Sequence, residues 1–291
     1  GGHEGREGEN LATAVIAGGA IAALVAALAG TGILASVVKA DTLPVWLTQP
    51  LFNTVGGPLP ALTVFVVLGV LTIGRIMGSR QGKYFIQSQA MLILNTLFLI
   101  LLVAGAAASI YHMLPGKSAS PQLLPVNTGW SIALESLKRE PLLGVGPGNF
   151  VEAFSRFRSI EYNNTSVWNL RFSASSNWYL ETWTVAGLLG IVAFLWLVWT
   201  VLRESGIRNQ ELGKPVYYGL LACLIIMLLV PVGFVLLFTF YLLLALVAST
   251  RASALRLEFS ASGGAARGNL VPGFFGLLAL LGLVAVGFWG R

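Results

Sequence analysis

Residues 215–250 read PVYYGLLACLIIMLLVPVGFVLLFTFYLLLALVAST, which is 36 consecutive positions without Asp, Glu, Lys or Arg. About 20 apolar residues in a helix cross the hydrocarbon core of a bilayer, so this stretch is far too long for one crossing. Pro231-Val232-Gly233 interrupts it near the middle, where a helix would break. Basic residues flank the stretch at both ends, which places both flanks on one side of a membrane. The sequence therefore predicts a hairpin of two short transmembrane helices.

Five further stretches free of these charged side chains lie along the chain. They run over residues 11–38, 57–74, 88–111, 182–202 and 268–290. Only 10% of the 291 residues are charged, against about 25% in a soluble domain, and the mean hydropathy is +0.78. These features predict an all-α polytopic membrane protein with about seven transmembrane helices, and they exclude a soluble globular domain.

The basic residues of the short connections predict the orientation of these helices. They gather in 75–83, 203–214 and 251–267, which we expect to be cytoplasmic. The long polar segment 112–181 is then extracytoplasmic. The predicted parts are three N-terminal transmembrane helices in 1–111, the extracytoplasmic loop in 112–181 and four C-terminal transmembrane helices in 182–291. The start, Gly-Gly-His, has no initiator Met, and we expect the chain to be a piece of a longer protein.

Composition also argues against several kinds of site. The net charge of +6 comes from basic residues scattered between apolar stretches, so no nucleic-acid partner is expected. The chain has one cysteine, Cys223, two histidines and one aspartate, Asp41. A disulfide within the chain is excluded, and the sequence has neither a zinc motif nor a carboxylate cluster for a divalent cation. We therefore expect no metal site and no cofactor.

The loop 112–181 contains two segments with recognisable local structure. Residues 130–138 carry apolar side chains at helical spacing and predict an amphipathic helix on the membrane surface that ends at Glu140-Pro141. Residues 141–150 read PLLGVGPGNF, and their three glycines allow positive φ or close backbone approach. Asn149 and Glu152 predict a capping box that opens a helix with Phe150, Phe154 and Phe157 on one face. A plain structural turn and an anion-binding turn both remain open for the glycine-rich run.

The second half of the loop is polar and aromatic. Residues 156–172 contain Arg156, Arg158 and Arg171 together with a run of amides and aromatics, a composition typical of sugar-contacting surfaces. Residues 177–190, NWYLETWTVAGLLG, then enter the next span. Its tryptophans and tyrosine suit an interfacial belt, whereas a carboxylate at the rim of a helix, Glu181, indicates a functional role.

Taken together and in order, segments 141–150 and 177–190 resemble two motifs of the O-antigen ligase and polymerase superfamily, which includes some protein O-oligosaccharyltransferases. The resemblance is close over residues 130–200. It implies a metal-independent glycosyltransferase of the plasma (inner) membrane. The donor would be a glycan on an undecaprenyl-pyrophosphate-type lipid. The acceptor would be a hydroxyl of a glycan, lipid or protein on the extracytoplasmic face, with membrane lipid as a further partner.

The resemblance also implies roles for individual residues. The predicted catalytic residues are Arg171, Glu181 and Asn177, and the predicted substrate-binding residues are Arg156, Arg158, Gly146, Gly148, Asn149, Ser176 and Tyr179. The arginines would neutralise the departing pyrophosphate. Ser176 stands where the ligases carry a histidine that is proposed to activate the acceptor. Two alternatives could replace that histidine: Glu181 could act as the base, or the transfer could depend on stabilisation of the leaving group alone.

A second function of a different class stays open. The chain could be a non-enzymatic membrane protein that binds, escorts or transports lipid-linked glycans. A transporter places ionisable residues inside its spans, and the predicted spans carry none of Asp, Glu, Lys and Arg apart from Glu181 at a rim. This difference favours the enzyme.

Overall fold

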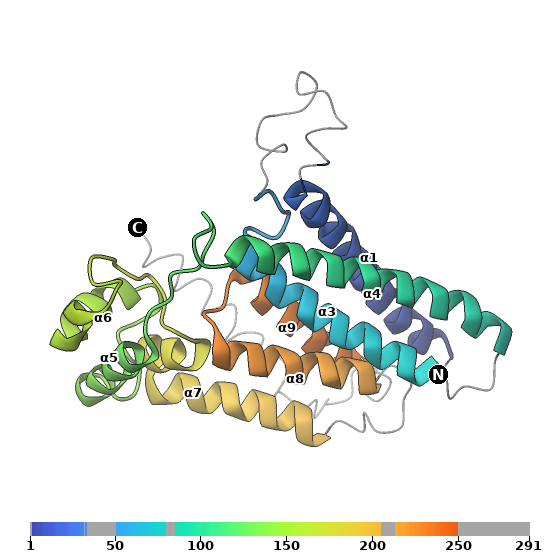
Figure 1. Ribbon diagram of the computed structural model, residues 1–291. Coiled ribbons are helices and arrows are strands. Elements are labelled where there is room, and N and C mark those ends of the chain that lie inside the picture. Colours follow the sequence, from blue (N-terminus) through green and yellow to red (C-terminus); the bar gives the residue numbers. More distant parts are fainter. Residues whose placement is uncertain (1, 32, 34–50, 80–84, 205–212, 250–291) are drawn as a thin grey trace, which may run out of the picture. The chain divides into compact units, whose positions relative to one another are not determined.

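The computed structural model describes residues 2–31, 33, 51–79, 85–204 and 213–249, and these residues contain helices and no strand. The helices are α1 (Gly2–Gly30), α3 (Pro58–Ser79), α4 (Phe85–Met113), α5 (Val126–Arg139), α6 (Phe150–Phe157), the 3-10 helix η2 (Ile160–Asn164), α7 (Trp178–Glu204), α8 (Gly213–Leu229) and α9 (Phe234–Ser249), as Figure 1 shows. The all-α class predicted from the sequence is confirmed for this part of the chain.

Four of the helices are long and apolar enough to cross a membrane. Their apolar windows are Asn10–Gly30, Pro58–Gly78, Gln89–Met113 and Trp178–Leu202. The helices α8 and α9 are apolar but shorter. The arrangement is consistent with a multi-pass membrane protein.

The predicted hairpin is present as two separate helices. The first, α8, ends at Leu229 and the second, α9, begins at Phe234, so the helical break predicted at Pro231-Val232-Gly233 is confirmed. The two helices contact each other and share a core that includes Leu220, Met227 and Phe240. The predicted span 268–290 lies outside the described residues.

The helices α1, α4, α8 and α9 pack around α3. Pro58 starts α3, where a missing N–H costs nothing and the fixed φ suits a helix. The packing is close where side chains are small: a Cβ on Gly105 of α4 would lie 2.6 Å from the Cβ of Ala23 on α1. Near the other end of α3, the Arg75 guanidinium donates to the Thr13 hydroxyl of α1 at 2.9 Å.

The helix α7 joins this bundle to the segment that carries the sequence motifs. On one side its Tyr179 hydroxyl donates to the Leu224 carbonyl of α8 at 3.4 Å, and Phe194 packs into the α8–α9 core. On the other side α7 contacts α5 and α6, which lie at the end of the bundle where α7 begins (Figure 1). Both motifs therefore meet along the first half of α7.

Candidate functional site

The segment between α4 and α7 has a small hydrophobic core of its own. Its buried side chains are Leu124, Ile132, Phe150, Ala153, Phe154, Phe157 and Tyr162. The Tyr162 hydroxyl lies within hydrogen-bond distance of the Val167 and Leu170 carbonyls, at 2.5 and 2.9 Å. Burial raises the pKa of Tyr162 and the nearby Arg158 guanidinium partly offsets that rise, so the hydroxyl stays protonated and its single proton can be donated to either carbonyl. The segment is thus a folded platform rather than a bare connection.

The amphipathic helix predicted at 130–138 is confirmed as α5, which ends at Arg139. The face of α5 that packs against the protein is not the one expected from the spacing of its apolar residues. Trp130 is 47% exposed, whereas the buried residues include Gly129 and Ser136. A Cβ on Gly129 would lie 2.5 Å from the Ser176 Oγ, so small side chains are needed where α5 meets the start of α7. Trp130 instead makes an edge contact with Trp183 of α7, with ring centroids 5.7 Å apart.

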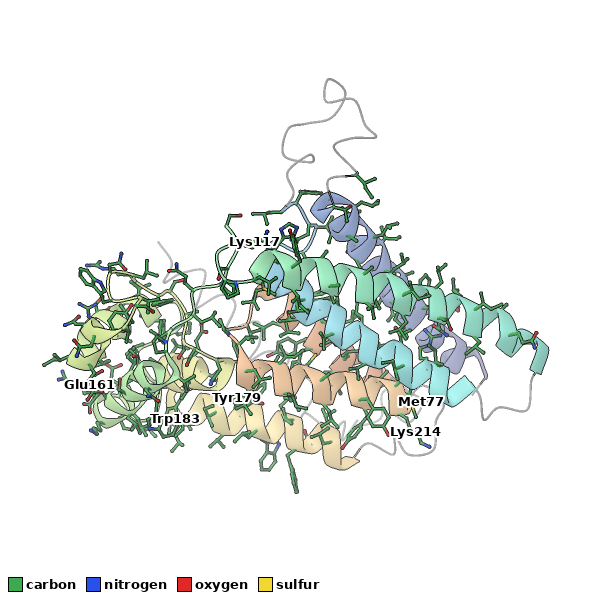
Figure 2. All side chains as sticks on the ribbon, viewed as in Figure 1. Met77, Lys117, Glu161, Tyr179, Trp183 and Lys214 are labelled. Carbon is green, nitrogen blue, oxygen red and sulfur yellow. The ribbon has the colours of Figure 1, made fainter. Side chains whose placement is uncertain are left out.

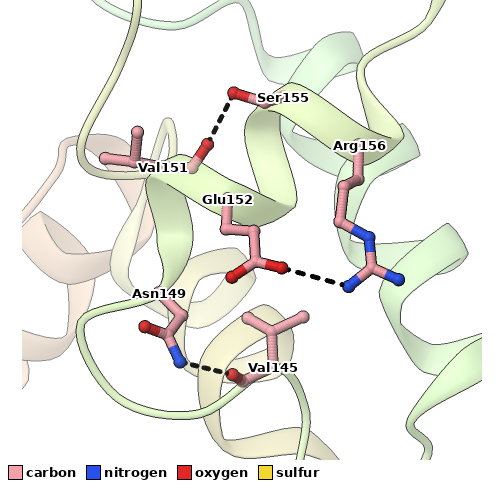
Figure 3. Close-up of polar contacts among 6 residues, drawn as sticks. All are labelled: Val145, Asn149, Val151, Glu152, Ser155 and Arg156. Carbon is pink, nitrogen blue, oxygen red and sulfur yellow. Dashed lines mark hydrogen bonds and ion pairs between the residues drawn. The ribbon is translucent and has the colours of Figure 1, made fainter.

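The helix predicted after the glycine-rich run is confirmed as α6, with Asn149 at its N-cap position and its phenylalanines buried. The predicted capping box is wrong. The Asn149 side chain donates back to the Val145 carbonyl at 2.9 Å, and Glu152 forms an ion pair with Arg156 at 3.3 Å (Figure 3). The Asn149 side chain does not cap α6, because the glycine turn places the Val145 carbonyl within reach of its amide.

The glycine-rich run makes a tight turn against a break in α7. Gly144, Gly146 and Gly148 have φ of 62°, 93° and 81°, in the left-handed region that glycine tolerates best. Inside α7, Gly187 has φ 63° and ψ −159°, which interrupts the helix. The predicted positive φ in the run is confirmed, whereas the break at Gly187 was not predicted.

Four backbone hydrogen bonds join the turn to the break. Val145 and Gly146 donate to the Thr184 and Val185 carbonyls, both at 3.0 Å. In the other direction, the Leu188 and Leu189 N–H groups donate to the Pro141 and Leu142 carbonyls at 3.0 and 3.1 Å. The groups that α7 releases by breaking are therefore satisfied by the turn, as buried backbone requires.

Gly144 and Gly187 face each other across this junction. A Cβ on Gly187 would lie 2.6 Å from the Gly144 nitrogen and the Leu142 carbonyl oxygen, and a Cβ on Gly144 would lie 2.8 Å from the Gly187 nitrogen. The two sequence motifs are thus held backbone to backbone. We call this contact, between residues 141–146 and 184–189, the glycine junction.

Four of the predicted site residues, Glu181 among them, lie in the first turn of α7 or just before it. Asn177 is its N-cap, because the Asn177 Oδ1 accepts the Leu180 N–H at 3.0 Å. Ser176 is buried against α5, and its hydroxyl has no hydrogen-bond partner among the described residues. Tyr179 points to α8, away from the platform. The sequence predicted chemistry for these positions, and the geometry gives Asn177 and Tyr179 structural contacts.

Glu181 lies in the first turn of α7 and is partly buried. Its Oε2 is buried and has no hydrogen-bond partner within the described part of the chain, and the same holds for the hydroxyls of Ser175 and Ser176. A buried carboxylate oxygen without a donor is costly unless another group binds it, so Glu181 is the strongest candidate for contact with a substrate hydroxyl. Figure 2 shows its neighbours Tyr179 and Trp183 on the same helix.

The predicted arginines lie on the platform, and aromatic rings support two of them. Arg156 stands over the Phe157 ring at 5.2 Å, and Arg158 stands over the Phe154 and Tyr162 rings at 5.7 and 5.5 Å. Such contacts use the face of a guanidinium and leave its N–H edges available to an anion, although one edge of Arg156 already pairs with Glu152. Arg139 of α5, which the sequence analysis missed, stands over Phe157 at 5.3 Å. Its place in the last turn of an amphipathic helix was the available signal.

Arg171 is exposed on the platform, and no ion pair or hydrogen bond to another described residue holds it. His112, the only histidine near the loop in sequence, packs against α1, where a Cβ on Gly30 would lie 2.9 Å from its Nε2. The structure therefore places Ser176, Asn177 and Glu181 around the start of α7 and joins the glycine turn to residues 184–189 of the same helix. It leaves Arg171 as a free surface cation among the described residues.

The chain was compared with models of protein families and with curated proteins. No family model matches it. No curated protein matches it either.

Proposed function

We propose that this chain is a membrane glycosyltransferase that moves a glycan from an undecaprenyl-pyrophosphate-type lipid to an acceptor hydroxyl. The reaction would take place at the extracytoplasmic face of the plasma (inner) membrane, in the assembly of cell-surface polysaccharide or glycoprotein. The glycine junction is the single observation that carries the proposal. The two segments that resemble family motifs are 27 residues apart in sequence, from Phe150 to Asn177, yet they are hydrogen-bonded together from one helical turn after Glu181 onward.

The proposed chemistry uses one carboxylate and several guanidinium groups. The acceptor oxygen attacks the anomeric carbon of the donor glycan, forming the new glycosidic bond. The bond from that carbon to the pyrophosphate oxygen breaks, and the lipid pyrophosphate leaves with the electron pair. The acceptor proton passes to Glu181, whose free Oε2 suits this role.

The arginines of the platform would stabilise the departing pyrophosphate. Arg156 and Arg158 are oriented by aromatic rings, and Arg171 is free to move toward a ligand. A planar guanidinium can donate two parallel hydrogen bonds to phosphate oxygens, which a lysine cannot do. Electrostatic stabilisation of this kind supplies a large part of many enzymatic rate accelerations.

One observation favours the alternative, a non-enzymatic protein that binds or escorts lipid-linked glycans. Ser176, at the position of the family's histidine, is only 3% exposed and lies under Gly129 of α5. Asn177 is engaged as a helix cap. If neither Glu181 acting as a base nor stabilisation of the leaving group supported the reaction, the site would hold a glycan lipid without transferring it.

A transfer assay with purified protein in phospholipid vesicles separates the two functions. The donor is an undecaprenyl-pyrophosphate-linked oligosaccharide, and donor binding and product are measured separately. We expect wild type to transfer, and Glu181→Gln to bind donor but lose transfer at least a hundredfold, as general-base removal does. Glu161→Gln, at an exposed glutamate of η2, is the matched control and should behave as wild type.

Two outcomes would contradict parts of the proposal. Donor binding by wild type without transfer to any acceptor would favour the binding protein. Full activity in Glu181→Gln would remove the proposed base while leaving the transferase possible through leaving-group stabilisation.

A further inference from the structure

The half of α7 after its break carries an exposed apolar stripe. Its members are Leu188, Leu189, Val192, Leu195, Trp196 and Trp199, all exposed. Their spacing of three, four and seven residues puts them on one face of a helix. Phe194 points the other way and packs into the α8–α9 core. No other described part of the chain covers the stripe.

The glycine junction extends this stripe onto the loop. Leu142 and Leu143 are 57% and 71% exposed, and the carbonyls of Pro141 and Leu142 accept the N–H groups of Leu188 and Leu189. The four leucines of the two segments therefore lie together at the end of the stripe nearest the break in α7. The exposed charged residues Lys138, Arg139 and Glu140 come directly before the turn and end the apolar surface.

Several backbone groups of the turn are hydrogen-bonded within the protein. Irregular backbone is tolerated at membrane depth only where its polar groups are satisfied. Pro141 has no N–H, and its carbonyl is bonded to Leu188. The N–H groups of Gly144, Val145 and Gly146 donate to the carbonyls of Glu140, Thr184 and Val185, and the Leu142 carbonyl accepts Leu189. Among the described residues, the N–H groups of Leu142 and Leu143 and the Leu143 carbonyl make no backbone hydrogen bond, so bonding within the protein satisfies only part of this turn.

Helix geometry places the junction below the surface of a bilayer. Gly187 lies 16 residues before Arg203, the first basic residue after the span. At 1.5 Å per residue this distance is about 24 Å, which is less than the hydrocarbon thickness of about 30 Å. If Arg203 marks one boundary of the hydrocarbon, Gly187 lies ~6 Å inside the opposite boundary. Glu181, six residues earlier, lies about 33 Å from Arg203 and so at headgroup level.

We propose that residues 141–143 form a re-entrant turn that inserts Leu142 and Leu143 among the acyl chains of the bilayer, beside the second half of α7. The bound partner is the bilayer itself. Continuity with the apolar stripe of a membrane-length helix, the backbone hydrogen bonds that join the turn to α7 and the charged residues before the turn carry this inference. It does not depend on the proposed transferase activity, because it concerns the surface that faces lipid.

Nitroxide labels in vesicles of phosphatidylethanolamine and phosphatidylglycerol test the insertion. Cys223 is buried and is the only cysteine, so Cys223→Ala gives a background for Leu143→Cys and, as a second position, Leu142→Cys. Val192→Cys is the acyl-chain reference and Ser166→Cys, on the exposed loop, is the aqueous reference. The accessibility of each label to oxygen and to a water-soluble nickel complex is measured.

We expect the oxygen-to-nickel accessibility ratio at Leu143 and Leu142 to match that at Val192 and to exceed that at Ser166 several-fold. A ratio equal to that at Ser166 would place the turn in water and overturn the proposal. Low accessibility to both reagents would also overturn it, since the turn would then be covered by protein, either another part of the chain or a second copy.

Discussion

At the scale of single residues, Gly144 and Gly187 connect the two motifs because neither carries a side chain. Both have positive φ, and each stands where a Cβ would strike the backbone of the other's segment. Gly148 has a similar φ of 81°, but nothing lies within 4 Å of where its Cβ would be. Adding a side chain at Gly148 therefore causes backbone strain alone, whereas adding one at Gly144 or Gly187 causes both backbone strain and a steric clash.

We expect Gly144→Ala and Gly187→Ala to open the glycine junction. Gly148→Ala should lower stability only through left-handed backbone strain, by about 1–2 kcal/mol. In the other two variants the new Cβ must also push away the backbone of the facing segment, so we expect a larger loss of stability. Thermal unfolding in detergent and the transfer assay measure both effects. Equal losses of stability and activity for all three variants would show that the close approach has no importance.

Substitutions of Asn177 can distinguish a helix-capping role from a catalytic role. If its side chain only caps α7, then Asn177→Ala should lower stability by about 1 kcal/mol, and Asn177→Asp and Asn177→Ser should restore stability and activity together. If the amide contacts substrate, the Asp and Ser variants should be stable but inactive. Stability and transfer rates of the three variants distinguish these cases.

At the scale of elements, much of the fold follows from sequence patterns. The apolar runs, the Pro231–Gly233 break, the end of α5 and the phenylalanine face of α6 were predicted, because each depends on residues close together in the chain. The break in α7 could not be predicted, since Gly187 lies in an apolar run and the break is held by hydrogen bonds from residues 141–146 to residues on either side of Gly187. The Asn149 side chain was mispredicted for the same reason, a competing acceptor in the turn.

The contact between α5 and α7 gives a prediction that departs from the family resemblance. Restoring histidine at position 176 should not raise activity, because the side chain would be forced against Gly129. Overpacking of this kind costs about 1–3 kcal/mol. Ser176→Ala removes a hydroxyl that has no hydrogen-bond partner among the described residues, and it should be neutral or slightly stabilising.

Ser173→His, at an exposed position of the same loop, is the matched control for the added imidazole. Stability and transfer are compared for the three variants. A higher transfer rate in Ser176→His at wild-type stability would mean that α5 moves to make room for the ring, and that the site accepts the histidine found in the ligases.

At the scale of the whole molecule, α7 links a bundle of apolar helices to a folded polar platform. The proposed chemistry requires the platform to lie outside the cytoplasm, as the basic short connections predict. With Cys223→Ala as background, an impermeant thiol reagent should label Ser120→Cys in intact cells and should not label Gly82→Cys. The reverse labelling would place the platform in the cytoplasm and reject the proposed donor side.

The glycan profile of cells with and without the gene tests the central claim, transfer of a lipid-linked glycan, most directly. Loss of the gene should remove or shorten one surface polysaccharide, glycolipid or glycoprotein and cause the lipid-linked donor to accumulate. Wild-type protein should restore the profile, and Glu181→Gln should not restore it. An unchanged profile, with the lipid-linked glycan at its normal level, would contradict the account.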